Sequence, residues 1–229
     1  MFTSGELKDA LYLMHVISYE DRKFNAPNRL AMSSYLVGNS CPLQEKKLQQ
    51  VGMIATLETN FQPNQHLFQD RRNVCNWIRN MPNVLSICGP GKQCPALASS
   101  KFGLHVRGDT FGSQRLMDTI LSGTVPIFTR TEQYTIIPPW IDWRKISMFV
   151  NVSSEDTFST DLERILSDEE GYEQKYKTLL ENRELFHWKT LYPFDTYMYM
   201  LQAHIYPETR KSSSDWSVLL LPPTPTTTT

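Results

Sequence analysis

Short apolar runs alternate with amphipathic segments along most of this chain, and this alternation constrains its fold more than any other feature. Apolar runs bounded by turn residues predict strands within residues 29–39, 83–89, 101–106, 125–129 and 145–152. Apolar residues at helical spacing predict helices within 66–82, 113–122 and 157–186. Such alternation predicts an α/β fold, a Rossmann-like parallel sheet with helices on both faces.

Composition narrows the class of protein. The chain has 229 residues, of which 40% are hydrophobic, so it can bury the core of one large domain, or of one and a half domains. Its 23 Lys and Arg residues nearly balance 24 Asp and Glu residues, for a net charge of −1. Bulk attraction to nucleic acid or to an anionic membrane is therefore excluded, and any anion site must be local.

Targeting signals give the next constraint. No run approaches the roughly 18 to 20 apolar residues of a membrane span, and Glu6, Lys8 and Asp9 interrupt the region where a secretory leader would lie. Taken as it stands, the sequence predicts a soluble cytosolic chain. That prediction fails if the sequence is the back part of a longer secreted or membrane-anchored protein.

The four cysteines are too sparse for a disulfide scaffold and form no C-x2-C pair of the kind that binds zinc; they are Cys41, Cys75, Cys88 and Cys94. Buried free thiols are the expected state. Alternatively, Cys88 and Cys94 could close a small loop in an oxidising compartment. The N-x-S triplet at 151–153 would matter only in such a compartment.

Residues 102–130 contain the most informative motif, a predicted strand, loop, helix and strand. The helix over 113–122 has an apolar side and a polar side; the polar side, expected to be solvated, carries Arg115, Asp118 and Thr119. Ser113 is a suitable N-cap, and Gly123 stands where a C′ residue would end the helix.

The loop "RGDTFG", residues 107–112, leaves the carboxyl end of a predicted parallel strand. Loop amides and the positive end of a helix dipole converge at this edge of an open α/β sheet, which is where ligands bind. Gly108 and Gly112 would let a ligand approach the backbone, and Arg107 has a planar fork suited to phosphate. Arg115 and Asp118 could then serve anion oxygens and ribose hydroxyls.

Two other interpretations of this motif stay open on the residues alone. Arg115 and Asp118 are spaced like an ordinary solvated i,i+3 pair, and an Arg-Gly-Asp adhesion loop would need an exposed tip. No P-loop and no G-x-G-x-x-G fingerprint occurs in the sequence. The pattern therefore indicates an anion or nucleotide site without identifying it.

The run "SSKFGLHVRGDTFGSQRLMDTILSGTVPIFTR", followed by "IIPPWIDWRKISMFVNVSSED", closely resembles the exostosin-like glycosyltransferase family. Members of that family carry a "SKFCL-x-PRGD-x-x-S-x-RLF(D/E)AI-x-x-G-x-(I/V)PVI" stretch. The match is dense over 99–156 and weaker over 28–204, where "NAPNRLAMSSYLVGN" resembles the Arg-led first strand of the family's nucleotide-binding domain. Val106, Gly103 and Met117 depart from the pattern at packing positions.

The resemblance implies the carboxyl half of a GT-B glycosyltransferase, which holds a nucleotide sugar, usually a UDP-sugar, as donor substrate. It implies transfer to a glycan or glycoprotein acceptor on the lumenal side of the Golgi membrane. Carried over position by position, the nucleotide-sugar-binding residues would be Arg107, Gly108, Asp109, Thr110, Ser113, Arg115 and Asp118. It implies no metal and no further cofactor, and it identifies no catalytic base.

The same resemblance implies a division of the chain. Residues 1–27 would be a connecting segment from a missing or truncated acceptor domain, and residues 28–210 the nucleotide-sugar-binding domain. The Ser/Thr/Pro-rich residues 211–229 are expected to form a disordered tail. The alternative is a noncatalytic nucleotide-binding or structural remnant of the same fold.

Overall fold

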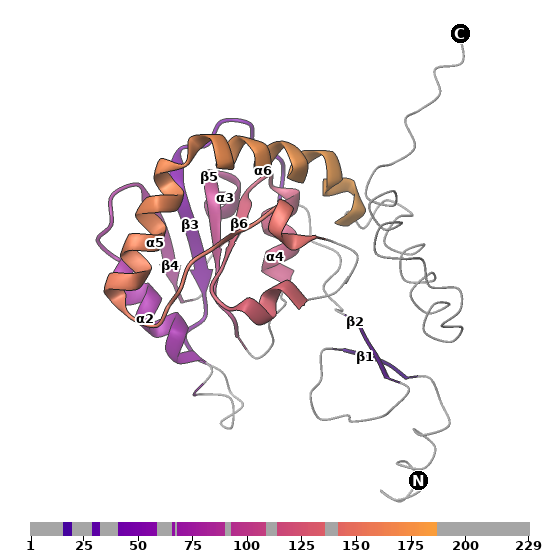
Figure 1. Ribbon diagram of the computed structural model, residues 1–229, viewed down its shortest axis with the longest axis horizontal. Coiled ribbons are helices and arrows are strands. Elements are labelled where there is room, and N and C mark those ends of the chain that lie inside the picture. The colour runs from indigo at the N-terminus through magenta and orange to yellow at the C-terminus, as the bar shows by residue number, and fades with distance from the viewer. Residues whose placement is uncertain are drawn as a thin grey trace, which may run out of the picture.

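A five-stranded parallel sheet forms the centre of the molecule (Figure 1). The computed structural model describes residues 16–19, 29–32, 41–58, 66, 68–89, 93–108, 114–135 and 142–186. The strands of this sheet are β3 (Gln49–Ala55), β4 (Val84–Cys88), β5 (Ser100–His105), β6 (Val125–Phe128) and β7 (Met148–Phe149). Their order in the sheet is β4-β3-β5-β6-β7. β3 therefore has β4 on one side and β5 on the other.

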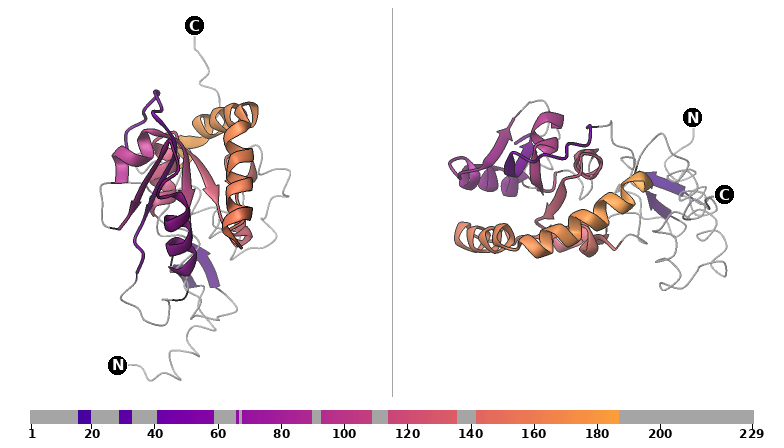
Figure 2. Two further views of the ribbon diagram at one scale, coloured as in Figure 1. Left: turned by 90° about the vertical axis from the view of Figure 1, so that its left-hand side faces the viewer. Right: turned by 90° about the horizontal axis from the view of Figure 1, so that it is seen from above.

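Helices connect and cover these strands. The α-helices are α2 (Gln69–Ile78), α3 (Gln93–Ala98), α4 (Gln114–Leu121), α5 (Glu155–Ser167) and α6 (Glu169–Asn182). Short 3-10 helices lie after β6 (η2, Thr131–Thr135), just before β7 (η3, Trp143–Lys145) and after α6 (η4, Arg183–Phe186). Helix α3 lies on one side of the sheet, and α5 and α6 lie on the other (Figure 2).

Alternating residues of the strands determine which helix packs on which face. Phe102 of β5 contacts Tyr172 of α6, with ring centroids 5.1 Å apart. The adjacent Gly103 faces α4 instead, because a Cβ added there would meet Thr119 at 2.6 Å. On the face that α6 covers, Trp77 of α2 packs against Phe158 of α5, with ring centroids 5.4 Å apart. Two apolar layers thus enclose the sheet, as the two-residue period of strands requires.

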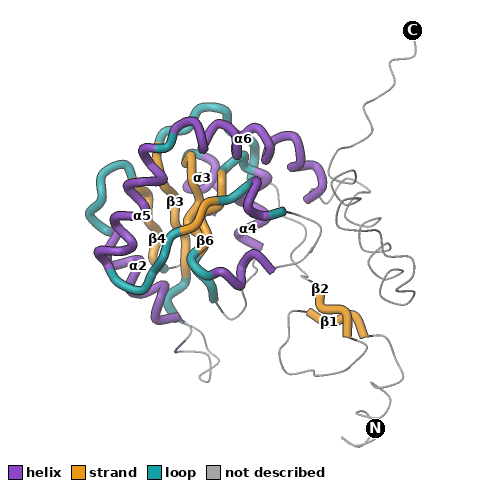
Figure 3. The backbone as a smooth tube through the Cα atoms, in the orientation of Figure 1, coloured by secondary structure: helices purple, strands orange, loops and turns teal. Residues whose placement is uncertain are grey.

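The predicted fold class, an α/β parallel sheet with helices on both faces, is confirmed. The placement of the first strand is wrong. Strand β2 (Arg29–Met32) exists but pairs with β1 (Val16–Tyr19) in a separate two-stranded sheet (Figure 3). The first strand of the central sheet is β3, whose apolar run is broken by Gly52 and preceded by two glutamines, so its pattern is weaker than that of residues 29–39.

Glycine at position 52 has a packing reason. A Cβ there would lie 2.6 Å from Ser100 Oγ and 2.9 Å from the Ala96 carbonyl oxygen. Helix α3, which contains Ala96, therefore approaches the sheet at backbone distance. The sequence pattern does not predict α3, because this helix has only six residues and a proline at its third position.

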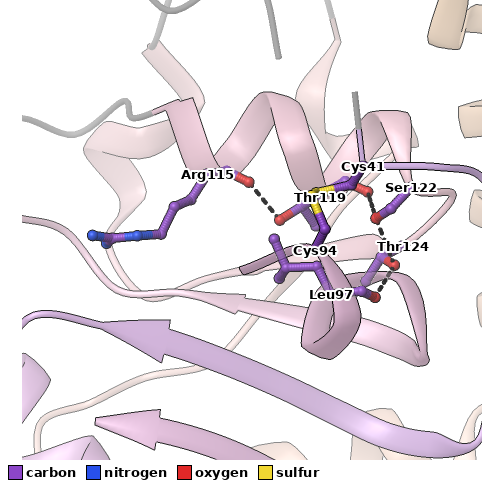
Figure 4. The surroundings of a disulfide bond; sticks show 7 residues. All are labelled: Cys41, Cys94, Leu97, Arg115, Thr119, Ser122 and Thr124. Carbon is purple, nitrogen blue, oxygen red and sulfur yellow. Dashed lines mark hydrogen bonds between the residues drawn. A yellow bond between two sulfur atoms is a disulfide. The ribbon is translucent and has the colours of Figure 1, made fainter. Parts of the chain in front are cut away.

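The expected free thiols are a second correction. Cys41 is bonded to Cys94 (Figure 4). Cys75 is bonded to Cys88, which leaves no free cysteine in the described chain. The alternative Cys88–Cys94 pair is also wrong. Cys88 points toward α2 on one face of the sheet, whereas Cys94 belongs to α3 on the other.

The domain boundaries at 27/28 and 210/211 stay predictions, because they lie outside the described residues. Within the described part of the chain, no helix combines the length and apolar character needed to cross a membrane.

Candidate functional site

The strand order places a topological switch point between β3 and β5. The chain leaves β3 for β4 on one side, and from β4 it crosses to β5 on the other side of β3. Open α/β sheets bind ligands in the crevice that such a reversal leaves at the carboxyl ends of the strands. Thr56 follows β3 at this edge, and Arg107 and Gly108 follow β5.

The buried side chain of Arg71, on the first turn of α2, joins the two strand ends. Its Nε donates to the carbonyl oxygens of Arg107 at 2.9 Å and Val106 at 3.3 Å. Its Nη1 donates to the carbonyl oxygen of Thr56 at 3.0 Å and to Thr56 Oγ1 at 3.2 Å. Only 4% of Arg71 is exposed, so this arginine ties the β3 end to the β5 loop from inside the fold.

The side chain of Arg71 lies directly beside Gly108. A Cβ added at Gly108 would clash with Nη2 of Arg71 and would lie 2.9 Å from its Cζ. Sequence reasoning assigned the missing Cβ to the approach of a ligand. In the structure the guanidinium group of Arg71 occupies the space that a Cβ at Gly108 would need.

Sequence reasoning missed Arg71, although its position carries a signal. Arg71 shares the buried stripe of α2 with Val74, Cys75 and Ile78, at the spacing i, i+3, i+4 and i+7. An arginine within an apolar stripe implies a dedicated set of hydrogen-bond acceptors, because a buried guanidinium without them is costly. Trp77 of the same helix is only half-buried.

Guanidinium groups gather at this edge of the sheet; they belong to Arg71, Arg72, Arg107 and Arg130. Arg72 donates to the carbonyl oxygen of Leu57 at 3.1 Å. Arg130, which follows β6, donates to Asp70 Oδ2 through Nε at 2.9 Å and Nη2 at 2.6 Å. This edge thus gathers four arginines, one of them paired with Asp70, in a chain whose net charge is −1.

The side chain of Gln133 fixes the loop after β6. Its Oε1 accepts from the backbone amides of Thr129 at 2.7 Å and Arg130 at 2.9 Å, and its Nε2 donates to the His105 carbonyl oxygen at 2.9 Å. The His105 ring is buried and packs edge-on against Phe128 at 6.0 Å. His105 therefore lies in the buried part of β5, and Gln133 is a further residue that the sequence pattern did not indicate.

Helix α4 corrects one expectation about the site. Arg115 is half-buried, but Asp118 and Thr119 are 4% and 3% exposed, so the polar side of α4 is not a solvated face. Thr119 packs against Gly103 and donates from Oγ1 to the Arg115 carbonyl oxygen at 2.6 Å (Figure 4). The helix is buried on both sides because β5 and η4 enclose it.

The predicted end of α4 is confirmed. Gly123 has a φ of 68°, its amide donates to the Ile120 carbonyl oxygen, and the Thr124 amide donates to that of Thr119. This pair of bonds is a Schellman motif, for which glycine at C′ is the favoured residue.

The structure therefore brings Arg107 and Gly108 to the switch point and places Arg115 and Asp118 on the helix that follows their loop. The other predicted nucleotide-sugar-binding residues, Asp109, Thr110 and Ser113, lie outside the described residues. Among the described residues, no cluster of three or more His, Cys, Asp or Glu side chains is arranged to hold a metal ion.

Solved structures with a similar course of the chain include TarM and a sucrose-phosphate synthase. TarM comes from S. aureus and was crystallised as a mutant with fondaparinux, α-GlcNAc-glycerol and UDP. The match covers 87% of the present chain and 43% of the TarM chain, with 10% identity and a TM-score of 0.48. The match with sucrose-phosphate synthase from Thermosynechococcus elongatus covers 85% of the present chain and 56% of the synthase chain, with 11% identity and a TM-score of 0.48. The chain thus spans about half the length of these proteins.

No curated protein matches the sequence. The exostosin GT47 domain matches residues 25–162, which is more than half of the chain and includes β3, β4, β5, α4, β6 and the loop after β5. The chain therefore belongs to the exostosin GT47 family of glycosyltransferases.

Proposed function

We propose that this chain supplies the donor-binding half of a GT-B glycosyltransferase that transfers a sugar from a nucleotide sugar, a UDP-sugar, to a glycan acceptor. The observation that carries the proposal is the Arg107–Gly108 loop at the switch point, fastened to β3 by Arg71. Family membership supports the reaction class, and the arginines at this edge support an anionic ligand.

In this proposal the donor diphosphate lies beside Arg107 and Gly108, near the amino end of α4. Arg107 supplies a permanent positive charge, and the helix dipole adds a partial one. Both are in place before the reaction, so they stabilise the charge that develops on the leaving diphosphate. Arg115 is proposed as a further phosphate or structural contact.

The remaining assignments rest on the family pattern. Asp118 is proposed to bind the ribose, and Asp109, Thr110 and Ser113 to complete the nucleotide-sugar site. Because Asp118 is buried, its role requires the ribose to reach the wall of α4. A base must also deprotonate the acceptor hydroxyl, and we assign it to no residue of this chain.

The paired cysteines support a lumenal location. Disulfide bonds persist in oxidising compartments and are rare in the cytosol, so two of them argue against the cytosolic location that the sequence favours when taken as it stands. We propose the lumenal side of the Golgi membrane, with any membrane anchor outside the described residues.

Thermal unfolding of the full chain with UDP, a UDP-sugar or ADP tests the proposal. A ligand that binds only the folded state raises the melting temperature, so UDP is expected to do so and Arg107→Ala to abolish the shift. Arg79→Ala is the matched control, because Arg79 is exposed at the opposite end of α2. Absence of a shift with every nucleotide would contradict the proposal. Stabilisation by UDP without sugar transfer in the full-length protein would favour a noncatalytic domain.

A further inference from the structure

The loop between β7 and α5 holds the sequence's single N-x-[ST] triplet, Asn151-Val152-Ser153. Asn151 and Ser153 are exposed, whereas Val152 is 7% exposed and packs into the main core. The buried valine holds the loop in place while the two residues of the acceptor motif face outward. β7 is the outermost strand on this side, so the loop lies at the periphery of the sheet.

Hydrogen bonds hold this loop in one conformation. Asn151 Oδ1 accepts from the Ser153 amide at 2.9 Å, and the Asn151 amide donates to Asp161 Oδ2 at 2.9 Å. Ser154 then caps α5 by accepting from the Thr157 amide at 3.2 Å. The first contact is an Asx-turn, which uses the oxygen of the Asn151 side chain and not its nitrogen. The glycan would be attached to Nδ2 of Asn151, and this nitrogen takes no part in the turn.

The two disulfides provide an independent observation. Their formation requires an oxidising compartment such as the lumen of the endoplasmic reticulum. N-x-S triplets act as acceptors only in proteins that enter that lumen. Disulfide formation and N-glycosylation would therefore occur in the same place, and an accessible triplet there is a usable acceptor.

We propose that Asn151 is an N-glycosylation site. Nδ2 of Asn151 forms a bond to C1 of the first sugar of a lipid-linked diphosphate oligosaccharide. The bond from that C1 to the diphosphate oxygen breaks, the lipid diphosphate leaves, and the amide nitrogen loses one proton to a base of the transferring enzyme. The proposal rests on the lumenal location put forward under the proposed function.

The test uses the full chain, fused behind a cleavable secretory signal and recovered from the medium of eukaryotic cells. Every recovered molecule has then passed through the lumen. The wild-type chain is expected to carry one glycan, seen as a mobility shift that peptide-N-glycosidase reverses while converting Asn151 to aspartate. Mass spectrometry of the peptide that spans the β7–α5 loop identifies the site.

Matched variants test whether glycosylation depends on the Asn151-Val152-Ser153 triplet itself. Asn151→Gln and Ser153→Ala are expected to lose the shift, and Ser153→Thr to keep it. Asn80→Gln, which alters an exposed asparagine outside any such triplet, should change nothing. Secreted wild-type chain without a glycan would overturn the proposal. That failure is separate from a failure to bind UDP, since each is measured on the same purified chain.

Discussion

The guanidinium group of Arg71 lies beside Gly108, in the space that a Cβ at position 108 would need. This contact couples the first turn of α2 to the loop after β5, the loop in which the proposed function places the donor diphosphate. Arg71 donates hydrogen bonds to the ends of β3 and β5. A change at Arg71 or Gly108 is therefore expected to disturb the relative position of these two strand ends.

Gly108→Ala is expected to destabilise the fold by about 1–3 kcal/mol, the range for an overpacked core, because it displaces the guanidinium from its acceptors. Urea unfolding measures this loss. In an Arg71→Met background the same substitution should cost much less, because the obstructing group is gone. Equal costs in the two backgrounds would show that the contact does not limit position 108.

Arg71→Lys is expected to weaken UDP binding about tenfold, or about 1.4 kcal/mol, at a temperature where the variant is fully folded. A lysine keeps the charge but lacks the planar fork that reaches Thr56 and Arg107 together. Titration calorimetry with UDP measures the effect. Arg79→Lys is the control, and an unchanged affinity in Arg71→Lys would limit Arg71 to a structural role.

The two disulfides are expected to differ in their contribution to stability. Loop-closure entropy gives about 3 kcal/mol for Cys75–Cys88 and about 4 kcal/mol for Cys41–Cys94. The difference follows from sequence separations of 13 and 53 residues. Denaturant unfolding of the paired alanine variants measures it, with the wild type as reference. A larger loss of stability on removing the shorter loop would show that loop closure is not the main source of the stabilisation.

Lys47 provides a pH-dependent prediction. Its Nζ donates to the carbonyl oxygens of Ala98 and Ser122, both at 2.9 Å, near the ends of α3 and α4. Burial lowers the pKa of Lys47 from 10.5 to about 8. Below pH 8 the folded chain bears the full cost of the desolvated charge. Between pH 8 and 10.5 the folded state releases the proton that the unfolded state keeps, and this cost decreases.

The wild type is therefore expected to gain stability relative to Lys47→Met as the pH rises from 8 to 10.5. Using the difference between the two chains cancels the titration of the other lysines and the tyrosines. Denaturant unfolding at several pH values measures it. A difference that is constant with pH would show that the carbonyl acceptors hold the ammonium form against desolvation.

Local patterns predicted α2, β4, β5, α4, β6, α5 and α6, and also Gly123 as the end of α4. Each of these elements carries its own periodicity or its own turn residue. The patterns failed at β3 and α3, where glycine, glutamine and proline weaken the local signal. Tertiary packing stabilises these two elements, since Gly52 lets the backbone of α3 approach the sheet.

The sequence by itself determined the fold class, the family and the position of Arg107 and Gly108 in the loop after a parallel strand, because these depend on residues close together along the chain. Only the tertiary structure decided which cysteines pair, that Arg71 is buried between β3 and β5, and that Asp118 lies inside the fold. These depend on the strand order and on which face of the sheet each helix covers, and neither is recorded in the periodicity of a single segment.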